Sequence, residues 1–219
     1  MATGVSAGVI IVPFLAMISY TLVPIPVVFA SLTLTMMMAY QGRREIDLQN
    51  TLVVSISMLV GILCSVYLLS HIHFDYLGLI FGIFILISVL ISLKVPHFEL
   101  STFASFSGGF IAGVMGTMAA VGGQILALLF QHHPLVSIKA TLAFLYTLFS
   151  LTMLAIFALF GDLAQEQLIS GVYLMPGFII GFLSAPYFSR YVNPRHSKSI
   201  VLLMATIGSL ILIYYSLSL

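Results

Sequence analysis

The chain has 219 residues, of which 61% are hydrophobic and only 6% carry a formal charge. A soluble domain carries about 25% charged residues, so this composition excludes a soluble globular protein and indicates an integral membrane protein. The formal net charge of +1 excludes a basic nucleic-acid-binding surface. The single cysteine, Cys64, excludes an intramolecular disulfide, and we expect it to be a small packing residue.

Apolar segments follow one another along the chain, and most are near the ~20 residues that a membrane-spanning helix needs. They lie at 4–20, 23–41, 51–70, 76–94, 103–131, 135–160, 168–189 and 199–219. Charged residues fall in the breaks between these segments, with Lys139 as the exception. The pattern predicts an all-α fold, a polytopic transmembrane bundle of about eight hydrophobic segments. No basic region precedes the apolar stretch Gly4–Tyr20, so we expect no cleavable signal peptide and a multi-pass protein of the cell (inner) membrane.

The segment 103–131 is too long for one plain span, and it contains the glycine pair Gly122-Gly123. Adjacent glycines weaken a helix, because glycine loses more backbone freedom on folding than any other residue. We therefore predict two helical pieces that meet near residues 117–122. In the first piece, small residues recur every four positions, a spacing typical of close helix packing in membranes. They are Ser105, Gly109 and Gly113.

The two halves of the chain resemble each other in the order of three short stretches. Residues 4–14 (GVSAGVIIVPF) align with 120–130 (AVGGQILALLF), residues 24–32 align with 134–142, and residues 61–75 align with 181–195. We therefore predict an internal duplication, with a first transmembrane repeat at 1–98 and a second at 99–219. The alternative is convergent membrane sequence of low complexity.

Basic residues mark the cytoplasmic loops of membrane proteins, and here they differ between equivalent loops. The loop after the second segment carries Arg43 and Arg44, whereas its counterpart at 161–167 carries no Lys or Arg. The loop at 71–75 also carries none, whereas its counterpart at 189–198 carries three. Equivalent loops therefore face opposite sides, which predicts two inverted repeats with broken or re-entrant helices. This orientation puts the basic loops inside and the C-terminus outside.

The glycine pair also predicts a ligand site. Unwound backbone at membrane depth is tolerated where it is buried in protein or lines a cavity. A half-helix that starts near Gly123 would direct N–H groups and a positive dipole end at an anion, and Gln124 would add an amide donor beside Gly122. The inverted copy of this turn, which would aim a second half-helix at the same centre, is Ser6-Ala7-Gly8. The alternative is that these small residues only allow helices to pack closely.

Three polar side chains of the apolar segments are further candidates for this site. Lys139 would supply counter-charge to the anion, or it would extend to the membrane interface. Thr141 and Ser31 would line the cavity as hydroxyl donors, unless they bond back to the preceding turn.

Two histidines, His132 and His133, lie at the end of a segment. A position at the membrane interface is a simpler interpretation of this pair than a metal site. We expect no metal and no cofactor.

Several stretches together resemble the TauE/SafE family of sulfite and sulfonate transport proteins. They are GVSAG (4–8) and PIPVVFASL (24–32) in the first half, with AVGGQ (120–124), PLVSIKATL (134–142), PGFIIGFLSAP (176–186) and NPRHSK (193–198) in the second. The resemblance covers nearly the whole chain. Two departures stand out: neither half keeps the full glycine triplet of the family, and Phe29 in the first half takes the place of the basic Lys139.

The resemblance implies a secondary transporter of small sulfur-containing anions, such as sulfite, sulfonates or related organosulfur anions. The implied partners are the lipid bilayer, the small anionic substrate and, where transport is coupled, a proton or a cation. The small-residue faces could also support a homodimer. The alternatives within transport are a passive anion channel and a carrier of another small carboxylate or sulfur anion. A membrane scaffold or an intramembrane enzyme is a different class, and the lack of a catalytic pair and of sizeable loops argues against both.

Overall fold

The computed structural model describes residues 8–69, 71, 76–93, 101–160, 163–188 and 194–217. Over these residues the chain is helical and contains no strand. The elements are α1 (Gly8–Ile18), the short 3-10 helix η1 (Tyr20–Leu22), α2 (Ile25–Gln41), α3 (Leu48–Leu69), α4 (Leu77–Leu93), α5 (Thr102–Ala119), α6 (Gly123–Leu129), α7 (Leu135–Phe160), α8 (Gln165–Phe188) and α9 (Pro194–Leu217).

Four of these helices are long and apolar enough to cross a membrane, judged by length and composition. They are α3 over Asn50–Leu69, α5, α7, and α8 over Gln165–Ser184. Shorter apolar helices are α2, α4 and the Leu202–Ser216 part of α9. The predicted all-α polytopic bundle is therefore confirmed. Many large apolar side chains on its outer surface are exposed, as expected for a protein surrounded by lipid.

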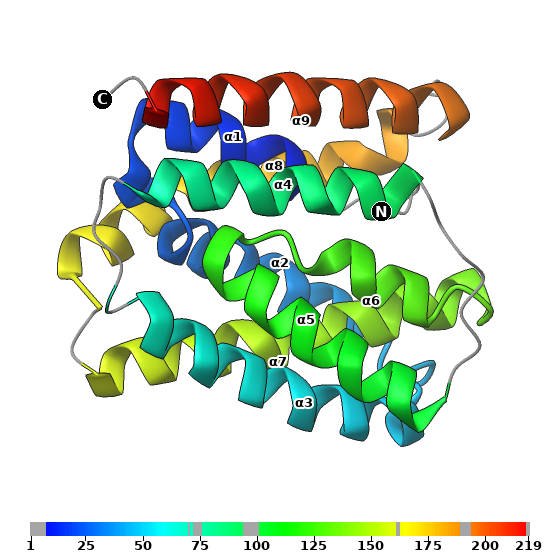
Figure 1. Ribbon diagram of the computed structural model, residues 1–219. Helices are drawn as coiled ribbons and strands as arrows, with labels where there is room; N and C mark the ends of the chain where they lie inside the picture. The colour runs from blue at the N-terminus through cyan, green and yellow to red at the C-terminus, as the bar shows by residue number, and fades with distance from the viewer. Residues whose placement is uncertain are drawn as a thin grey trace.

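The helices lie roughly parallel or antiparallel to one another, with their ends at the left and right of Figure 1. In that view α2, α4 and α8 run from left to right, whereas α3, α7 and α9 run from right to left. The aligned stretches pair α2 with α7 and α3 with α8, and the order along the chain pairs α4 with α9. Each helix therefore runs opposite to its counterpart, which is the arrangement of an inverted repeat.

The predicted break in the long apolar segment is confirmed, and it lies at residues 120–122, between α5 and α6. Ala120 ends α5 in the left-handed conformation, with a φ of 53°, and its N–H donates to the Gly116 carbonyl at 2.9 Å. After the turn α6 runs back along α5, because Leu129 packs on Gly108, where a β-carbon would lie 2.7 Å from the leucine side chain. The counterpart α1 runs in the opposite direction to α6 in Figure 1.

The helices α3 and α5 cross with their backbones in close contact. A β-carbon at Gly113 would overlap the carbonyl oxygen of Met58, and one at Gly61 would overlap the carbonyl oxygen of Phe110. Gly109 is equally tight against α3. The close packing predicted for the small residues of α5 is therefore confirmed for Gly109 and Gly113.

The buried core has two parts. One is built mainly from α3 and α7 with residues of α2 and α6, and the other mainly from α1, α4, α5 and α9. Ala120 and Ile125 pack against both parts. The break between α5 and α6 therefore lies where the two parts of the core meet.

Candidate substrate cavity

A cavity of about 120 Å³ lies beside the break between α5 and α6. This volume is well above the roughly 10–15 Å³ that a single water needs. Its walls come from both halves of the chain. The lining residues are Ile11, Val27, Val28, Ser31, Leu34, Thr35 and Met58 from the first half, and Ala112, Gly116, Ala120, Gly122, Leu126, Tyr146, Phe149, Ser150 and Phe178 from the second.

The inverted halves contribute equivalent positions to this cavity. The alignment of 61–75 with 181–195, continued three residues toward the N-terminus, pairs Met58 of α3 with Phe178 of α8. Both side chains line the cavity. The cavity therefore lies between the two oppositely running halves of the chain, which is the position at which inverted-repeat transporters bind their substrates.

The cavity wall is mainly apolar, and its polar groups are hydroxyls and backbone. The Ser31 hydroxyl donates to the Val28 carbonyl at 2.9 Å, and that of Thr35 donates to the Leu32 carbonyl at 3.0 Å. Ser150 is only 2% exposed and also lines the cavity. A serine hydroxyl in a cavity wall is a group that can hydrogen-bond to a bound ligand or water. Among the described residues that line the cavity, none has a cationic side chain.

The structure brings two of the predicted site residues, Gly122 and Ser31, into the cavity wall. Gly122 also packs tightly on α5, because a β-carbon there would overlap the carbonyl oxygen of Ala112. The sequence analysis treated close helix packing and a ligand site as alternative roles for this glycine. In the structure Gly122 both packs on α5 and lines the cavity. Gly123 begins α6 and is buried. Of the predicted counterpart turn, Gly8 begins α1, and Ser6 and Ala7 lie outside the described residues.

Gln124 is buried, with 2% of its surface exposed, but it is not among the residues that line the cavity. Neither its amide nitrogen nor its amide oxygen has a hydrogen-bond partner within the described chain. The Thr117 hydroxyl, on α5, is likewise buried without a partner there. Unpaired buried polar groups are costly, so water or a bound solute near the break would stabilise this part of the protein.

Lys139 and Thr141 lie in the first two turns of α7, away from the cavity wall. Lys139 is exposed. Thr141 is buried, and its hydroxyl oxygen accepts a hydrogen bond from the backbone N–H of Asp47 at 3.0 Å. The Ser137 hydroxyl donates to the Glu45 carbonyl at 2.8 Å, in the same contact. Thr141 therefore fastens the loop between α2 and α3 to α7.

His133, at the start of the same contact, places its Nε2 3.8 Å from a carboxylate oxygen of Asp47. Over the described part of the chain, no group of three or more His, Cys, Asp or Glu side chains lies close enough to hold a metal ion. His132 is exposed.

We expect Thr141→Val to lower the free energy of unfolding by about 1 kcal/mol, the usual net value of one hydrogen bond. The valine keeps the shape of the side chain but removes the acceptor for the Asp47 N–H. Thermal unfolding of the purified protein in detergent measures this loss. The matched control is Thr147→Val, since the Thr147 hydroxyl donates only within its own helix, to the Ala143 carbonyl. Equal destabilisation by the two variants would contradict the role given to Thr141.

The two helical halves run in opposite directions, and a cavity lies where they meet. This architecture is typical of polytopic membrane transporters. The model of the sulfite exporter TauE/SafE family matches residues 1–212 of the chain. The chain belongs to this family of membrane transporters, as the resemblance of its glycine and proline stretches predicted. No individual curated protein and no solved structure matches the chain significantly.

Proposed function

We propose that the protein is a secondary transporter of small sulfur-containing anions, and that the cavity between the two repeats is its substrate site. The observation that carries this proposal is the position of the cavity, which is lined by Gly122 at the break and by the equivalent residues Met58 and Phe178 of the two halves. A rocking motion of one repeat against the other would expose this position to each side in turn.

The lining favours anions with one charge and an apolar part, such as organic sulfonates, over small multiply charged anions. A second negative charge on the substrate would have to leave water without a cationic partner among the described wall residues, and such a transfer is costly in a mainly apolar site. The Ser150 hydroxyl is the donor for the charged head, the Ser31 hydroxyl becomes a second one when it turns away from the Val28 carbonyl, and the apolar wall would cover the organic part. Gln124, buried and unpaired near the break, is available to a ligand if the break opens during the cycle.

We further propose that the protein lies in the cell (inner) membrane. The end of the molecule that holds Arg43 and Arg44 would face the cytoplasm, because basic loops remain on that side. The exposed Lys139 belongs to this end, where its ammonium would remain at the interface. A proton or cation could be the coupling partner.

The test is uptake of labelled sulfite and of labelled alkyl and aryl sulfonates into proteoliposomes. We expect saturable uptake and counterflow, which a passive channel would not show. Ser150→Ala should raise the KM roughly tenfold or more, since a hydrogen bond to a charged group is worth about 1.5–3 kcal/mol. Ser31→Ala should raise the KM less, because the Ser31 hydroxyl must first leave the Val28 carbonyl. Lys139→Gln should change the KM by about twofold at most in physiological salt, because exposed charges are screened.

Absence of transport for every sulfur anion tested would contradict the proposed function. If Lys139→Gln weakened transport as strongly as the serine variants do, the substrate would bind the end of α7 and the cavity would not be the site.

A further inference from the structure

Ser88 of α4 makes a hydrogen bond that differs from those of most hydroxyls in the apolar helices. The hydroxyls of Ser31, Ser57 and Thr147 donate to carbonyls of their own helices. Such bonds back to the preceding turn are common for serine and threonine in membrane helices. The Ser88 hydroxyl instead donates to the carbonyl of Val121 at 3.3 Å, in the link between α5 and α6. Ser88 is 1% exposed and Val121 is fully buried, so this bond is shielded from bulk water.

The link between α5 and α6 carries backbone groups that no helix pairs. The N–H groups of Ala120 and Val121 cap α5 by donating to carbonyls of its last turns. The Val121 carbonyl receives its hydrogen bond from Ser88. A buried carbonyl without a donor is costly inside a membrane protein, so this bond stabilises one orientation of the link.

The peptide group that joins Val121 to Gly122 lies between α4 and the cavity. Its carbonyl points to Ser88, and no described residue of α4 lines the cavity. Because the group is planar and trans, its N–H, which belongs to Gly122, points in the direction opposite to the carbonyl. Ala120 and Gly122 are in the cavity wall, whereas Val121 between them packs in the part of the core that contains α4. The Gly122 N–H therefore faces the cavity.

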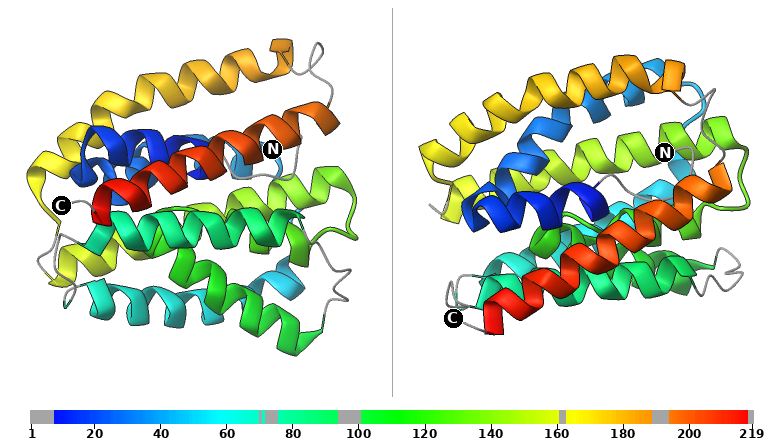
Figure 2. Two further views of the ribbon diagram at one scale, coloured as in Figure 1. Left: turned by 45° about the horizontal axis from the view of Figure 1, so that its top comes forward. Right: turned by 90° about the horizontal axis from the view of Figure 1, so that it is seen from above.

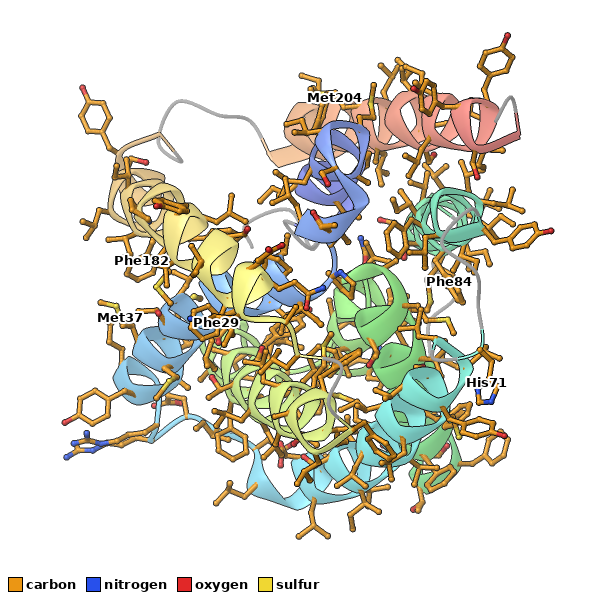
Figure 3. The ribbon with its side chains drawn as sticks, turned by 90° about the vertical axis from the view of Figure 1, so that its left-hand side faces the viewer. Phe29, Met37, His71, Phe84, Phe182 and Met204 are labelled. Carbon is orange, nitrogen blue, oxygen red and sulfur yellow. The ribbon has the colours of Figure 1, made fainter. Side chains whose placement is uncertain are left out.

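The helix α4 is a firm support for this bond, because it packs between α9 and the α5–α6 pair (Figure 1). A β-carbon at Gly82 would overlap the side chain of Ile213 on α9, and both views of Figure 2 show α9 alongside α4. Figure 3 shows α4, the helix that carries Phe84, beside α5. Ser88 follows Phe84 by one turn. A hydroxyl on a helix held from both sides fixes the direction of its acceptor more precisely than one on a loop.

We infer that Ser88 is a positioning residue of the substrate site. By holding the Val121 carbonyl toward α4, it aims the Gly122 N–H into the cavity, where this N–H donates to the anionic head of the substrate. The inference rests on the proposed function and adds a backbone donor to the Ser150 hydroxyl. An N–H donor suits a wall without a cationic side chain among its described residues, because a hydrogen bond to a charged oxygen is stronger than one between neutral groups. Glycine also lets a ligand approach the backbone closely.

Nuclear magnetic resonance of a selectively labelled protein tests both steps of the inference. The chain contains two Val–Gly pairs, Val60–Gly61 and Val121–Gly122, so valine labelled with ¹³C at the carbonyl and glycine labelled with ¹⁵N select two amide signals. We expect methanesulfonate to move the amide proton of Gly122 downfield in a saturable manner. The signal of Gly61, which lies inside α3 and outside the cavity wall, should stay in place.

Ser88→Ala should move the Val121 carbonyl signal upfield and abolish the response of Gly122 to methanesulfonate. The KM for methanesulfonate uptake into proteoliposomes should rise about fivefold, the factor that corresponds to the usual net value of one hydrogen bond, with an unchanged maximal rate. Ser57→Ala is the matched control, because Ser57 is equally buried and donates within its own helix to the Val54 carbonyl. This control should keep the wild-type KM and both wild-type signals.

The possible failures are distinguishable. A Gly122 signal that does not move at methanesulfonate concentrations that saturate wild-type uptake would overturn the inference and leave the proposed function intact. A wild-type carbonyl signal or a wild-type KM in Ser88→Ala would overturn the role of Ser88. Absence of sulfonate uptake by the wild-type protein would overturn the proposed function and the inference with it.

Discussion

Gly113→Leu is expected to leave little or no folded protein in the membrane. The β-carbon alone would overlap the carbonyl oxygen of Met58, and the rest of the leucine would have to enter the space occupied by α3. Overpacking destabilises a protein by about 1–3 kcal/mol where neighbouring side chains can adjust. The neighbour here is backbone, which cannot move aside, so we expect Gly113→Leu to lose at least the upper value of this range. The readouts are the yield of monodisperse protein in mild detergent and its thermal unfolding temperature.

The matched control for this variant is Gly177→Leu, which makes the same change in a membrane helix whose glycine has open space around it. We expect this control to be produced at the wild-type level and to unfold at the same or a higher temperature, because leucine is the better helix former. If both variants unfolded alike, α3 and α5 would not be held together by their glycine crossing.

Gly122→Ala is expected to abolish transport with a smaller loss of folded protein. Its added methyl group would overlap the carbonyl oxygen of Ala112, so α6 must move away from α5. Because Gly122 also lines the cavity, this shift changes the proposed substrate site directly. Uptake into proteoliposomes should fall to the level of protein-free vesicles, while size-exclusion chromatography still shows a monodisperse protein.

The neighbouring Ala120→Gly substitution is the control at the same break. Ala120 holds a φ of 53°, a left-handed conformation that costs a non-glycine residue roughly 1–2 kcal/mol. Glycine relieves this strain and adds no atom, so transport should persist and thermal stability should stay equal or rise. Transport by Gly122→Ala at the wild-type rate would show that contact between α5 and α6 at this point is not needed for function.

Much of the architecture follows from local properties of the chain. Long apolar segments must form helices in lipid, because no other structure pairs every backbone group within one segment. The break at 120–122 follows from the glycine pair, and the α5 crossing follows from Gly109 and Gly113. The reversed loop charges predicted the opposite directions of the two halves. Each of these predictions needs only the composition and spacing of neighbouring residues.

The residues that line the cavity could be predicted from the sequence only in part. Ser150, a hydroxyl of the cavity wall, was missed, although Tyr146, Phe149 and Ser150 share one face of α7 by their helical spacing. Thr141 carries the same hydroxyl chemistry, but the loop before α3 covers it and uses its oxygen as an acceptor. Nothing in the residues themselves shows which faces of a uniformly apolar helix point inward, because lipid and protein interior are equally apolar.

The amino-acid sequence alone therefore indicates a helical membrane protein with a glycine break and a resemblance to a transporter family, and it predicts an inverted duplication. Those conclusions rest on hydropathy, charge asymmetry and backbone preference, which act over a few residues or along one segment. The rotation of each helix about its own axis depends on contacts between distant segments. Those contacts place Gly122 and Ser31 in a shared wall, leave Lys139 outside it, cover the glycines of α3 with α5 and leave those of α8 open.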